Sequence, residues 1–342
     1  MTIDLFLTPF FIAFALTVGC ILLFLLVPLF KRSVWRTESR HAQRKTLSRL
    51  GGVAMLFAFL FTLFFDSHLV LTRELYGVLC GGLLILFFGL WDDLKEIEWK
   101  VQIFFQIALT ALVFIFGIHI HSLSNPFGGV WIVPYEIFVL PGFLLLFFWM
   151  FLVMNALNWL DGLDGLCGSI SLITFITIFF LSLKPEVYQP PIAILAVVGM
   201  GITIGFLFFN FYPARILAGT VGSMFLGFLI AILAVIAGTK IATALLVLSL
   251  PILDALFVIW QRFREGSSLF LPDKRHLHFR LLEIGWSERQ IAVFFFFITS
   301  VIAVIALNTQ ALGKFFALFI VAIIIFGFLL FVDWRIRLKQ RN

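Results

Sequence analysis

The sequence N-A-L-N-W-L-D-G-L-D-G-L, residues Asn155–Leu166, follows a long apolar run and gathers polar side chains at its end. Amides and carboxylates recur there at every third position, at Asn155, Asn158, Asp161 and Asp164. On a regular α-helix this spacing drifts by about 60° per step, which spreads the four side chains around half of the helix. Gly162 and Gly165 permit a tightened or broken turn that brings them to one side. Polar groups are costly at the end of a membrane-length segment, so the stretch predicts a functional site; an acidic loop that merely ends a helix is the alternative.

The composition predicts an all-α integral membrane protein. The chain has 342 residues, of which 62% are hydrophobic and 12% charged, with a mean hydropathy of +1.14. Soluble domains carry about 25% charged residues. Eleven apolar runs follow one another, near residues 6–30, 51–65, 75–91, 101–118, 138–154, 167–183, 191–209, 221–237, 241–260, 290–308 and 315–333. We therefore expect one polytopic domain over residues 1–342, with about ten or eleven transmembrane helices joined by functional loops.

Basic residues predict the orientation in the membrane. An odd number of spans puts the termini on opposite sides, and cytoplasmic loops carry an excess of Lys and Arg. With the C-terminus in the cytoplasm, 20 of the 24 Lys and Arg fall on the cytoplasmic side. The loops with the polar motifs then face the cytoplasm of the cell membrane. The net charge of +6 suits lipid phosphates and nucleotides, and we expect no nucleic acid partner.

Four further polar motifs lie in or beside the predicted cytoplasmic loops. Asp92 and Asp93, with Glu96 four residues after Asp92, offer the oxygen ligands that Mg²⁺ prefers, although such a cluster also ends helices. The others are Asn210 with the glycine-rich Gly219–Gly227, the basic segment Pro272–Arg280 with His276, His278 and Arg280, and Asp254 inside an apolar run. The basic segment favours phosphate over zinc, because no cysteine is near. The sequence leaves two roles open for Asp254: it holds the following loop, for example through Arg262, or it contacts the substrate.

In their order along the chain, these motifs resemble those of the polyprenyl-phosphate N-acetylhexosamine-1-phosphate transferases. The resemblance rests on D-D-L-K-E at 92–96, the stretch 155–166, N-F-Y-P-A-R-I-L-A-G-T-V-G-S-M-F-L-G at 210–227, P-I-L-D-A-L-F-V-I-W-Q-R at 251–262 and P-D-K-R-H-L-H-F-R-L-L-E-I-G at 272–285. It implies transfer of a sugar 1-phosphate from a UDP-sugar to a polyprenyl phosphate, such as undecaprenyl phosphate, with release of UMP. Such a reaction initiates cell-wall or surface polysaccharides. The H-L-H-F-R form is similar to that of the bacterial N-acetylglucosamine-type initiators.

The resemblance also implies roles for individual residues. Asp92, Asp93, Asp161 and Asp164 become the catalytic acids, with Asp93 and Asp164 as ligands of Mg²⁺ or Mn²⁺. The substrate-binding residues become Asn155, Asn158, Asn210, His276, His278 and Arg280. A homodimer is compatible with the family. Two positions depart from its pattern: Thr220 stands where relatives have a metal-binding aspartate, and Phe279 replaces a common third histidine.

Two other functions compete with this expectation. A secondary transporter would also be an apolar bundle, but it places its polar groups at the membrane midplane in repeated halves. Here only Asp254 lies well inside an apolar run. A catalytically impaired paralogue that still binds lipid phosphate or nucleotide is the stronger rival because of Thr220. The particular sugar, the prenyl length and the pathway do not follow from the sequence.

Overall fold

The computed structural model describes residues 4–27, 35–36, 47–134, 139–237, 241–266 and 275–341. Most of the basic loop 31–49 and the segment 272–274 lie outside these residues. The longer helices are α1 (Asp4–Leu26), α3 (Gly51–Phe65), α4 (Arg73–Leu94), α5 (Trp99–Ile115), α6 (Val139–Leu160), α7 (Leu166–Ser182), α8 (Pro190–Asn210), α9 (Gly219–Ile236), α11 (Ser249–Arg264), α13 (Glu288–Asn308) and α14 (Ala311–Arg341). Two short helices are α10 (Ile241–Val247) and α12 (Leu277–Glu283). The all-α membrane architecture is confirmed.

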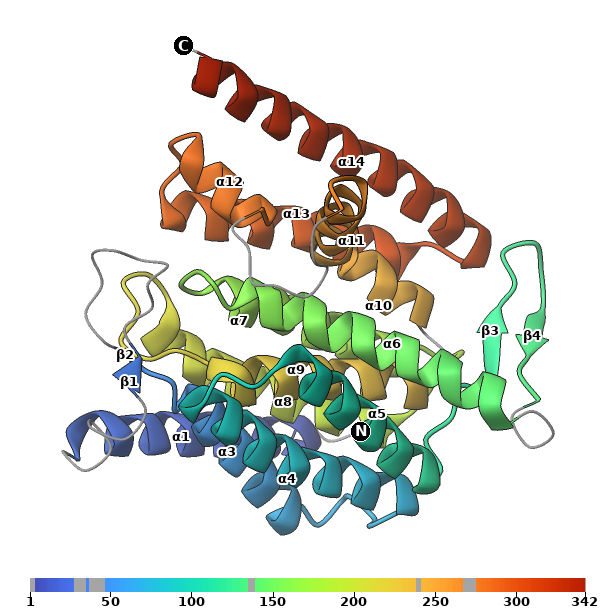
Figure 1. Cartoon of the computed structure of the whole chain (residues 1–342). Helices are drawn as coiled ribbons and strands as arrows, with labels where there is room; N and C mark the ends of the chain where they lie inside the picture. The colour runs from blue at the N-terminus through green and yellow to red at the C-terminus, as the bar shows by residue number, and fades with distance from the viewer. Residues whose placement is uncertain are drawn as a thin grey trace.

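Most of the long helices run in nearly the same direction across Figure 1. By length and composition, seven helices in the described part of the chain can cross a membrane: α1, α4, α6, α8, α9, α13 and α14. The bent pair α10–α11 is an eighth candidate, and α3, α5 and α7 are shorter apolar helices. At 1.5 Å per residue, the 15 residues of α3 extend about 22 Å, less than the hydrocarbon core of about 30 Å. Each predicted apolar run corresponds to one of these helices or to the bent pair.

One predicted run is not a single straight helix. The run 241–260 divides at Leu248 into α10 and α11, whose axes differ by 75°. Figure 1 shows α11 almost end-on while α10 lies along the bundle. Pro251, in the first turn of α11, cannot donate a backbone hydrogen bond to the preceding turn, which favours a break at this place.

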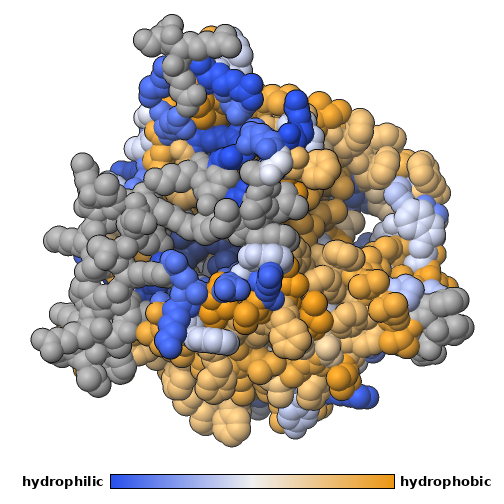
Figure 2. Space-filling model, viewed as in Figure 1, coloured by the Kyte–Doolittle hydropathy of each residue, from blue (hydrophilic) through white to orange (hydrophobic). Residues whose placement is uncertain are grey.

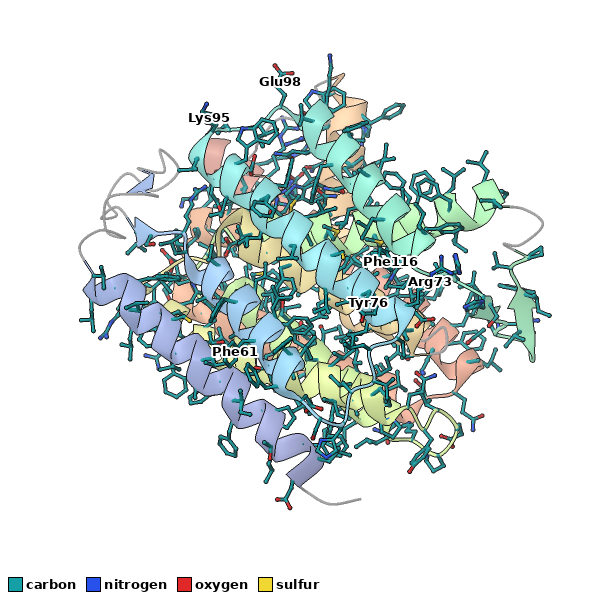
Figure 3. All side chains as sticks on the ribbon, turned by 90° about the horizontal axis from the view of Figure 1, so that it is seen from below. Phe61, Arg73, Tyr76, Lys95, Glu98 and Phe116 are labelled. Atoms are coloured by element: carbon teal, nitrogen blue, oxygen red, sulfur yellow. The ribbon has the colours of Figure 1, made fainter. Side chains whose placement is uncertain are left out.

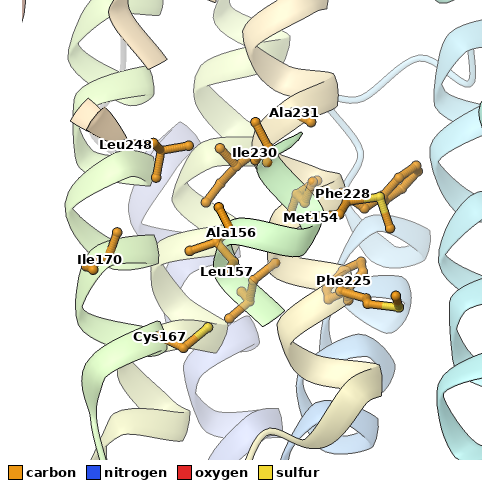
Figure 4. Close-up of a cluster of buried hydrophobic side chains, with 14 of the residues drawn as sticks. Met154, Ala156, Leu157, Cys167, Ile170, Phe225, Phe228, Ile230, Ala231 and Leu248 are labelled. Carbon is orange, nitrogen blue, oxygen red and sulfur yellow. The ribbon is translucent and has the colours of Figure 1, made fainter. Parts of the chain in front are cut away.

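Helix α9 forms the centre of the bundle. In its membrane-length window 94% of the residues are buried, against 17% for α14 and 22% for α1 at the periphery. Figure 4 shows Phe225 and Phe228 of α9 packed with Met154 and Leu157 of α6. Apolar packing therefore fixes α9 and with it the position of its N-terminal turn.

Glycines let α3 approach α9 closely. A Cβ atom at Gly52 would overlap the backbone of Gly222, and one at Gly51 would lie 2.5 Å from the carbonyl oxygen of Leu217. This close approach allows two backbone hydrogen bonds: Gly51 N–H donates to Leu217 O at 3.1 Å, and Gly52 N–H donates to Ala218 O at 2.9 Å. The start of α3 is therefore fastened directly to the segment that leads into α9.

Two small antiparallel ribbons lie at opposite ends of the bundle (Figure 1). Strand β1 (Trp35–Arg36) pairs with β2 (Leu47–Ser48), and β3 (Ser122–Ser124) pairs with β4 (Val130–Ile132). The second ribbon confirms the hairpin predicted within residues 119–137, of which 135–138 are not described. Its turn contains Gly128 and Gly129, both with positive φ.

Hydrophilic residues gather at one end of the molecule. Figure 3 places Lys95 and Glu98 at one end of α4 and α5, and Arg73 at the other end. In Figure 2, hydrophilic surface is concentrated on the side of α12 and the C-terminal turns of α14, whereas apolar side chains cover most of the remaining surface. The ends of α4 and α6 and the starts of α7 and α9 lie on this same side (Figure 1).

Candidate active site

The acid pair Asp92–Asp93 sits in the last turn of α4. Asp93 is 4% exposed, and both of its carboxylate oxygens accept the backbone N–H of Thr220 at 3.1 Å. The guanidinium of Arg49 lies 3.3 Å from Asp93 Oδ1 and forms an ion pair with it. The buried charge is therefore balanced by a cation and by the N-terminal turn of α9.

Asp92 is half-buried and has different partners. Its Oδ2 accepts a hydrogen bond from the hydroxyl of Thr220 at 2.6 Å. Its Oδ1 accepts from the backbone N–H of Ile97 at 3.2 Å and from the side-chain amide of Gln102 at 3.3 Å. The structure thus places position 220 directly beside the acid pair, as the sequence motif predicts.

The N-terminal turn of α9 is shaped by Gly219, which has φ +67°. A Cβ atom there would lie 2.6 Å from Asp93 Oδ2 and 2.8 Å from the carbonyl oxygen of Arg49. Only glycine permits both this backbone conformation and this approach. One turn later, the hydroxyl of Ser223 lies 2.7 Å from Asn158 Oδ1 of α6. The start of α9 therefore joins the acid pair to the stretch 155–166.

The stretch 155–166 breaks between α6 and α7. Helix α6 ends at Leu160, α7 begins at Leu166, and Gly165 between them has φ +73°, so the predicted broken turn is confirmed. Asp164 is 1% exposed, and its Oδ2 accepts the backbone N–H of Ala214 at 2.8 Å. Asp161 is half-buried in the same turn.

Asn210 ties this turn to the end of α8. Its Oδ1 accepts the N–H of Gly165 at 3.0 Å, and its Nδ2 donates to Ile216 O at 2.9 Å. The side chain of Asn155, by contrast, bonds inside the bundle. Its Nδ2 donates to Gln106 Oε1 of α5 at 2.9 Å and to Phe151 O at 2.7 Å. The substrate-binding roles of both asparagines remain predictions, and their visible contacts hold the loops in place.

Helix α12 lies against the same turn. A Cβ atom at Gly162 would lie 3.0 Å from His278 Nε2 and 2.9 Å from Phe279 Cζ. His278 is fully buried, and its ring centroid lies 4.1 Å from that of Phe279. The two most distinctive motifs of the sequence, more than a hundred residues apart, therefore meet at Gly162.

Arg280 fastens α12 to two other helices. Its guanidinium contacts Asp333 of α14 at 3.2 Å and also bonds to Gln261 of α11 and to the carbonyl of Arg275. It lies 5.2 Å from the centroid of the Phe257 ring. With 4% exposure, Arg280 positions α12, and its predicted contact with substrate remains a prediction.

Sequence reasoning missed several residues of this region. Arg49 counts in the sequence analysis only among the basic residues that orient the protein, although it lies two residues before the first of the glycines that bring α3 to α9. Gln102 and Gln106 are one helical turn apart on α5. Gln102 hydrogen-bonds to Asp92, and Gln106 hydrogen-bonds to Asn155. Polar amides at this spacing in an apolar helix were the available signal.

Comparison with known proteins supports the motif-based expectation. The family model described as glycosyl transferase family 4 matches residues 75–238. A probable undecaprenyl-phosphate N-acetylglucosaminyl 1-phosphate transferase of Bacillus subtilis is 28% identical over 92% of this chain and 89% of its own length. A decaprenyl-phosphate N-acetylglucosaminephosphotransferase of Mycobacterium leprae is 33% identical over 76% of this chain and 73% of its own length. An undecaprenyl-phosphate alpha-N-acetylglucosaminyl 1-phosphate transferase of Yersinia pestis is 26% identical over 85% of this chain. The chain is thus a multi-pass membrane phosphotransferase that belongs to glycosyl transferase family 4, the family that its loop motifs predict.

Proposed function

We propose that this protein transfers N-acetylhexosamine 1-phosphate from a UDP-sugar to a polyprenyl phosphate and releases UMP. N-acetylglucosamine is the sugar named for the relatives in Bacillus, Mycobacterium and Yersinia, and we propose it as the sugar of the donor. One observation carries the proposal: Thr220 touches Asp92 and Asp93, while Ser223 of the same turn touches Asn158. Two acids of α4 and an amide of α6 thereby meet at the start of one buried helix, α9.

The chemistry requires positioning more than a strong base. The attacking oxygen belongs to a phosphate monoester, whose second pKa of about 6 leaves it largely dianionic at neutral pH. The barrier lies in bringing two anions together and in stabilising charge on the diphosphate, which cationic groups achieve. In our proposal Arg49, which pairs with Asp93, supplies positive charge beside the acids, and the basic segment that leads into α12 supplies it for the phosphates. Asp92 or Asp93 would add general base catalysis only as a minor contribution.

We propose Mg²⁺ as the metal, with Mn²⁺ as a substitute. The donor set is suitable: Asp92 presents a carboxylate oxygen 2.6 Å from the hydroxyl of Thr220, and Asp93 adjoins both. Mg²⁺ is commonly held by one or two carboxylates together with substrate phosphates and water, and a threonine hydroxyl serves as its ligand in phosphate-binding loops. Asp92, Asp93 and Thr220 would hold it together with substrate phosphates, because no three His, Cys, Asp or Glu side chains form a metal-binding group within the described residues. The role of Asp164 as a second ligand remains a prediction. When bound, Mg²⁺ would neutralise the negative charge of the phosphates.

We place the site at the cytoplasmic face of the cell membrane. The excess of Lys and Arg in the loops at this end supports that orientation. The phosphate of a lipid acceptor lies at headgroup level while its prenyl chain stays among the helices and lipids, which suits a site at the ends of helices. A homodimer remains our prediction for the assembly state, and the mass of the purified protein measures it.

A catalytically impaired paralogue is the second candidate. It is favoured by Thr220, whose hydroxyl and N–H hydrogen-bond to the acid pair where a metal-binding aspartate is expected from the family pattern. A threonine supplies one negative charge less than an aspartate, which weakens attraction for a divalent cation. Such a protein would still bind nucleotide or lipid phosphate.

One assay separates these functions. Purified protein in lipid nanodiscs would be incubated with Mg²⁺, undecaprenyl phosphate and a panel of radiolabelled UDP-sugars. Transfer of label to the lipid phase with equal release of UMP supports the enzyme, and the preferred donor identifies the sugar. Saturable binding of UDP-sugar without transfer at any Mg²⁺ concentration supports the impaired paralogue. Neither binding nor transfer with any donor would overturn both.

A further inference from the structure

Asp254 is a buried carboxylate that the proposed reaction does not use. It lies in α11, six residues after Leu248, where the 75° break separates this helix from α10, and it is 2% exposed. Because α11 turns away from the direction of the bundle, Asp254 meets α12 instead of the membrane interior. The partner suggested by the sequence, Arg262, is not the one that the contacts of Asp254 show.

Both carboxylate oxygens of Asp254 are engaged at the start of α12. Oδ2 lies 3.0 Å from Nδ1 of His276, and Oδ1 accepts the backbone N–H of Leu277 at 2.8 Å. An ionised carboxylate only accepts hydrogen bonds, so opposite such a carboxylate Nδ1 of His276 is the atom that carries the hydrogen. The hydrogen bond that one ring nitrogen makes decides whether the other nitrogen carries a hydrogen. Here the bond from Nδ1 to Asp254 leaves Nε2 without a hydrogen and open to a different partner.

The ring of His276 is held in one orientation by its neighbours. The ring of Trp159, from the stretch 155–166, lies 5.4 Å away at 30°, and that of His278 lies 5.9 Å away at 5°. Within the part of the chain that the structure describes, Nε2 of His276 has no hydrogen-bond partner. His276 is 8% exposed, so only a small part of its surface remains for a ligand.

We propose that Asp254 is a positioning residue that fixes His276 with its hydrogen on Nδ1 and reserves Nε2 for a phosphate oxygen of an anionic substrate. On binding, Nε2 takes a proton from solvent, and the imidazolium donates to phosphate on one side and to Asp254 on the other. The carboxylate stabilises that charged form. This inference rests on the proposed function for the identity of the substrate. The phosphate belongs to the UDP-sugar or to the polyprenyl phosphate, and the experiment distinguishes the two.

Asp254→Asn tests the inference with little change of shape. An amide has one acceptor and one donor group, so it cannot accept from both Leu277 N–H and His276 Nδ1–H. We expect the hydrogen of the ring to move to Nε2, which ¹⁵N NMR of histidine-labelled protein detects. His276→Gln assigns the signal among the six histidines of the chain. Asp254→Glu retains a carboxylate and should restore the Nδ1–H form at least in part.

Asp333→Asn is the matched control. Asp333 holds the same helix α12 through Arg280 but lies on α14 and does not touch His276. If the inference is correct, the Asp333→Asn substitution loosens α12 without changing the NMR signals of the His276 ring.

In transfer assays, Asp254→Asn should raise KM about tenfold to hundredfold for the substrate whose phosphate meets His276, and leave KM for the other substrate nearly unchanged. The selective rise identifies donor or acceptor.

A binding measurement on the unmodified protein keeps the inference testable if transfer is absent or Asp254→Asn fails to fold. UDP and a short-chain polyprenyl phosphate are titrated separately while the His276 signals are recorded. A shift of Nε2 to the protonated form with either ligand supports the inference even where the proposed transfer fails. No response of Nε2 to either ligand overturns it, as would wild-type ring signals in folded Asp254→Asn or the same signal change in Asp333→Asn.

Discussion

The hydroxyl of Thr220 donates a hydrogen bond of 2.6 Å to the carboxylate of Asp92. Thr220 also gives its N–H to Asp93, so a single residue of α9 contacts both acids at the end of α4. The resemblance to the family implies an aspartate at this position, and its carboxylate would face two others. Thr220 therefore changes the charge of the site without leaving its neighbours unbonded.

Replacing Thr220 by aspartate should lower the Mg²⁺ concentration needed for transfer. The added carboxylate strengthens attraction for a divalent cation, whereas without metal it repels Asp92. We expect wild-type protein to be active with a raised Mg²⁺ requirement and Thr220→Asp to reach half-maximal rate at about tenfold lower Mg²⁺. Thr220→Val, which keeps the shape but loses the hydroxyl, is the control.

Electron paramagnetic resonance of bound Mn²⁺ measures the change in metal affinity without turnover. An unmoved Mg²⁺ curve for Thr220→Asp removes position 220 from the metal site, and restoration of a dead wild type identifies an inactivated paralogue.

Asp93→Asn should reduce transfer by at least about a hundredfold while the protein still folds. The amide can still accept from Thr220 N–H, but it no longer carries the charge that pairs with Arg49. Asp164→Asn, with one oxygen left to accept from Ala214 N–H, should behave in the same way. Steady-state transfer and thermal unfolding in detergent are measured together. Near-normal, Mg²⁺-dependent turnover in a folded variant would show that its acid is dispensable.

His278→Ala should impair use of the donor far more than insertion into the membrane. The ring is fully buried between α12 and the turn at Gly162, so its loss lets α12 settle against the turn differently. We expect KM for the UDP-sugar to rise about tenfold or more. Membrane fractionation with quantitative blotting is the control for insertion. If KM and kcat match those of the wild type, the basic segment serves only to orient the protein.

Gly52→Ala should destabilise the protein strongly. A methyl group there would overlap the backbone of Gly222, and overpacking of a rigid core typically costs about 1–3 kcal/mol or more. Gly19→Ala in α1 is the matched control, because no atom lies within 4 Å of the added methyl group. That substitution should be neutral or stabilising by up to about 1 kcal/mol. Unfolding temperatures in one detergent compare the two, and equal temperatures would mean that α3 and α9 do not pack as closely as described.

The orientation is open to labelling with an impermeant thiol reagent in a cysteine-free background. Glu98→Cys at the exposed start of α5 should be protected in intact cells, whereas Phe127→Cys on the β3–β4 hairpin, 79% exposed, should react. Ser267, in the large basic loop, lies outside the described residues and is less suitable. The reverse pattern would place the acid cluster outside the cytoplasm.

Hydropathy was sufficient to predict the helices, because each apolar run has to satisfy its backbone hydrogen bonds internally. The turn at Gly162 and Gly165 could also be predicted, since residue spacing and glycine are local signals. The break between α10 and α11 could not, because a proline such as Pro251 is also tolerated within a straight membrane helix, and the bend depends on packing. Partners distant in sequence were equally hidden: Asp254 meets His276 across 22 residues, and Asn155 meets Gln106 across 49.

Helix α12 is held by one helix that precedes it in the chain, α11, and by one that follows it, α14. Asp254 of α11 holds its first residues, whereas Asp333 binds Arg280 and Lys339 donates to the carbonyl of Glu283, both from α14. During synthesis the ribosome delivers α12 before α14. A nascent chain that has inserted α1–α13 thus carries every predicted catalytic acid but only one of the two supports for its histidine segment. We infer that the site matures as one of the last events of membrane insertion, when the C-terminal turns of α14 reach α12.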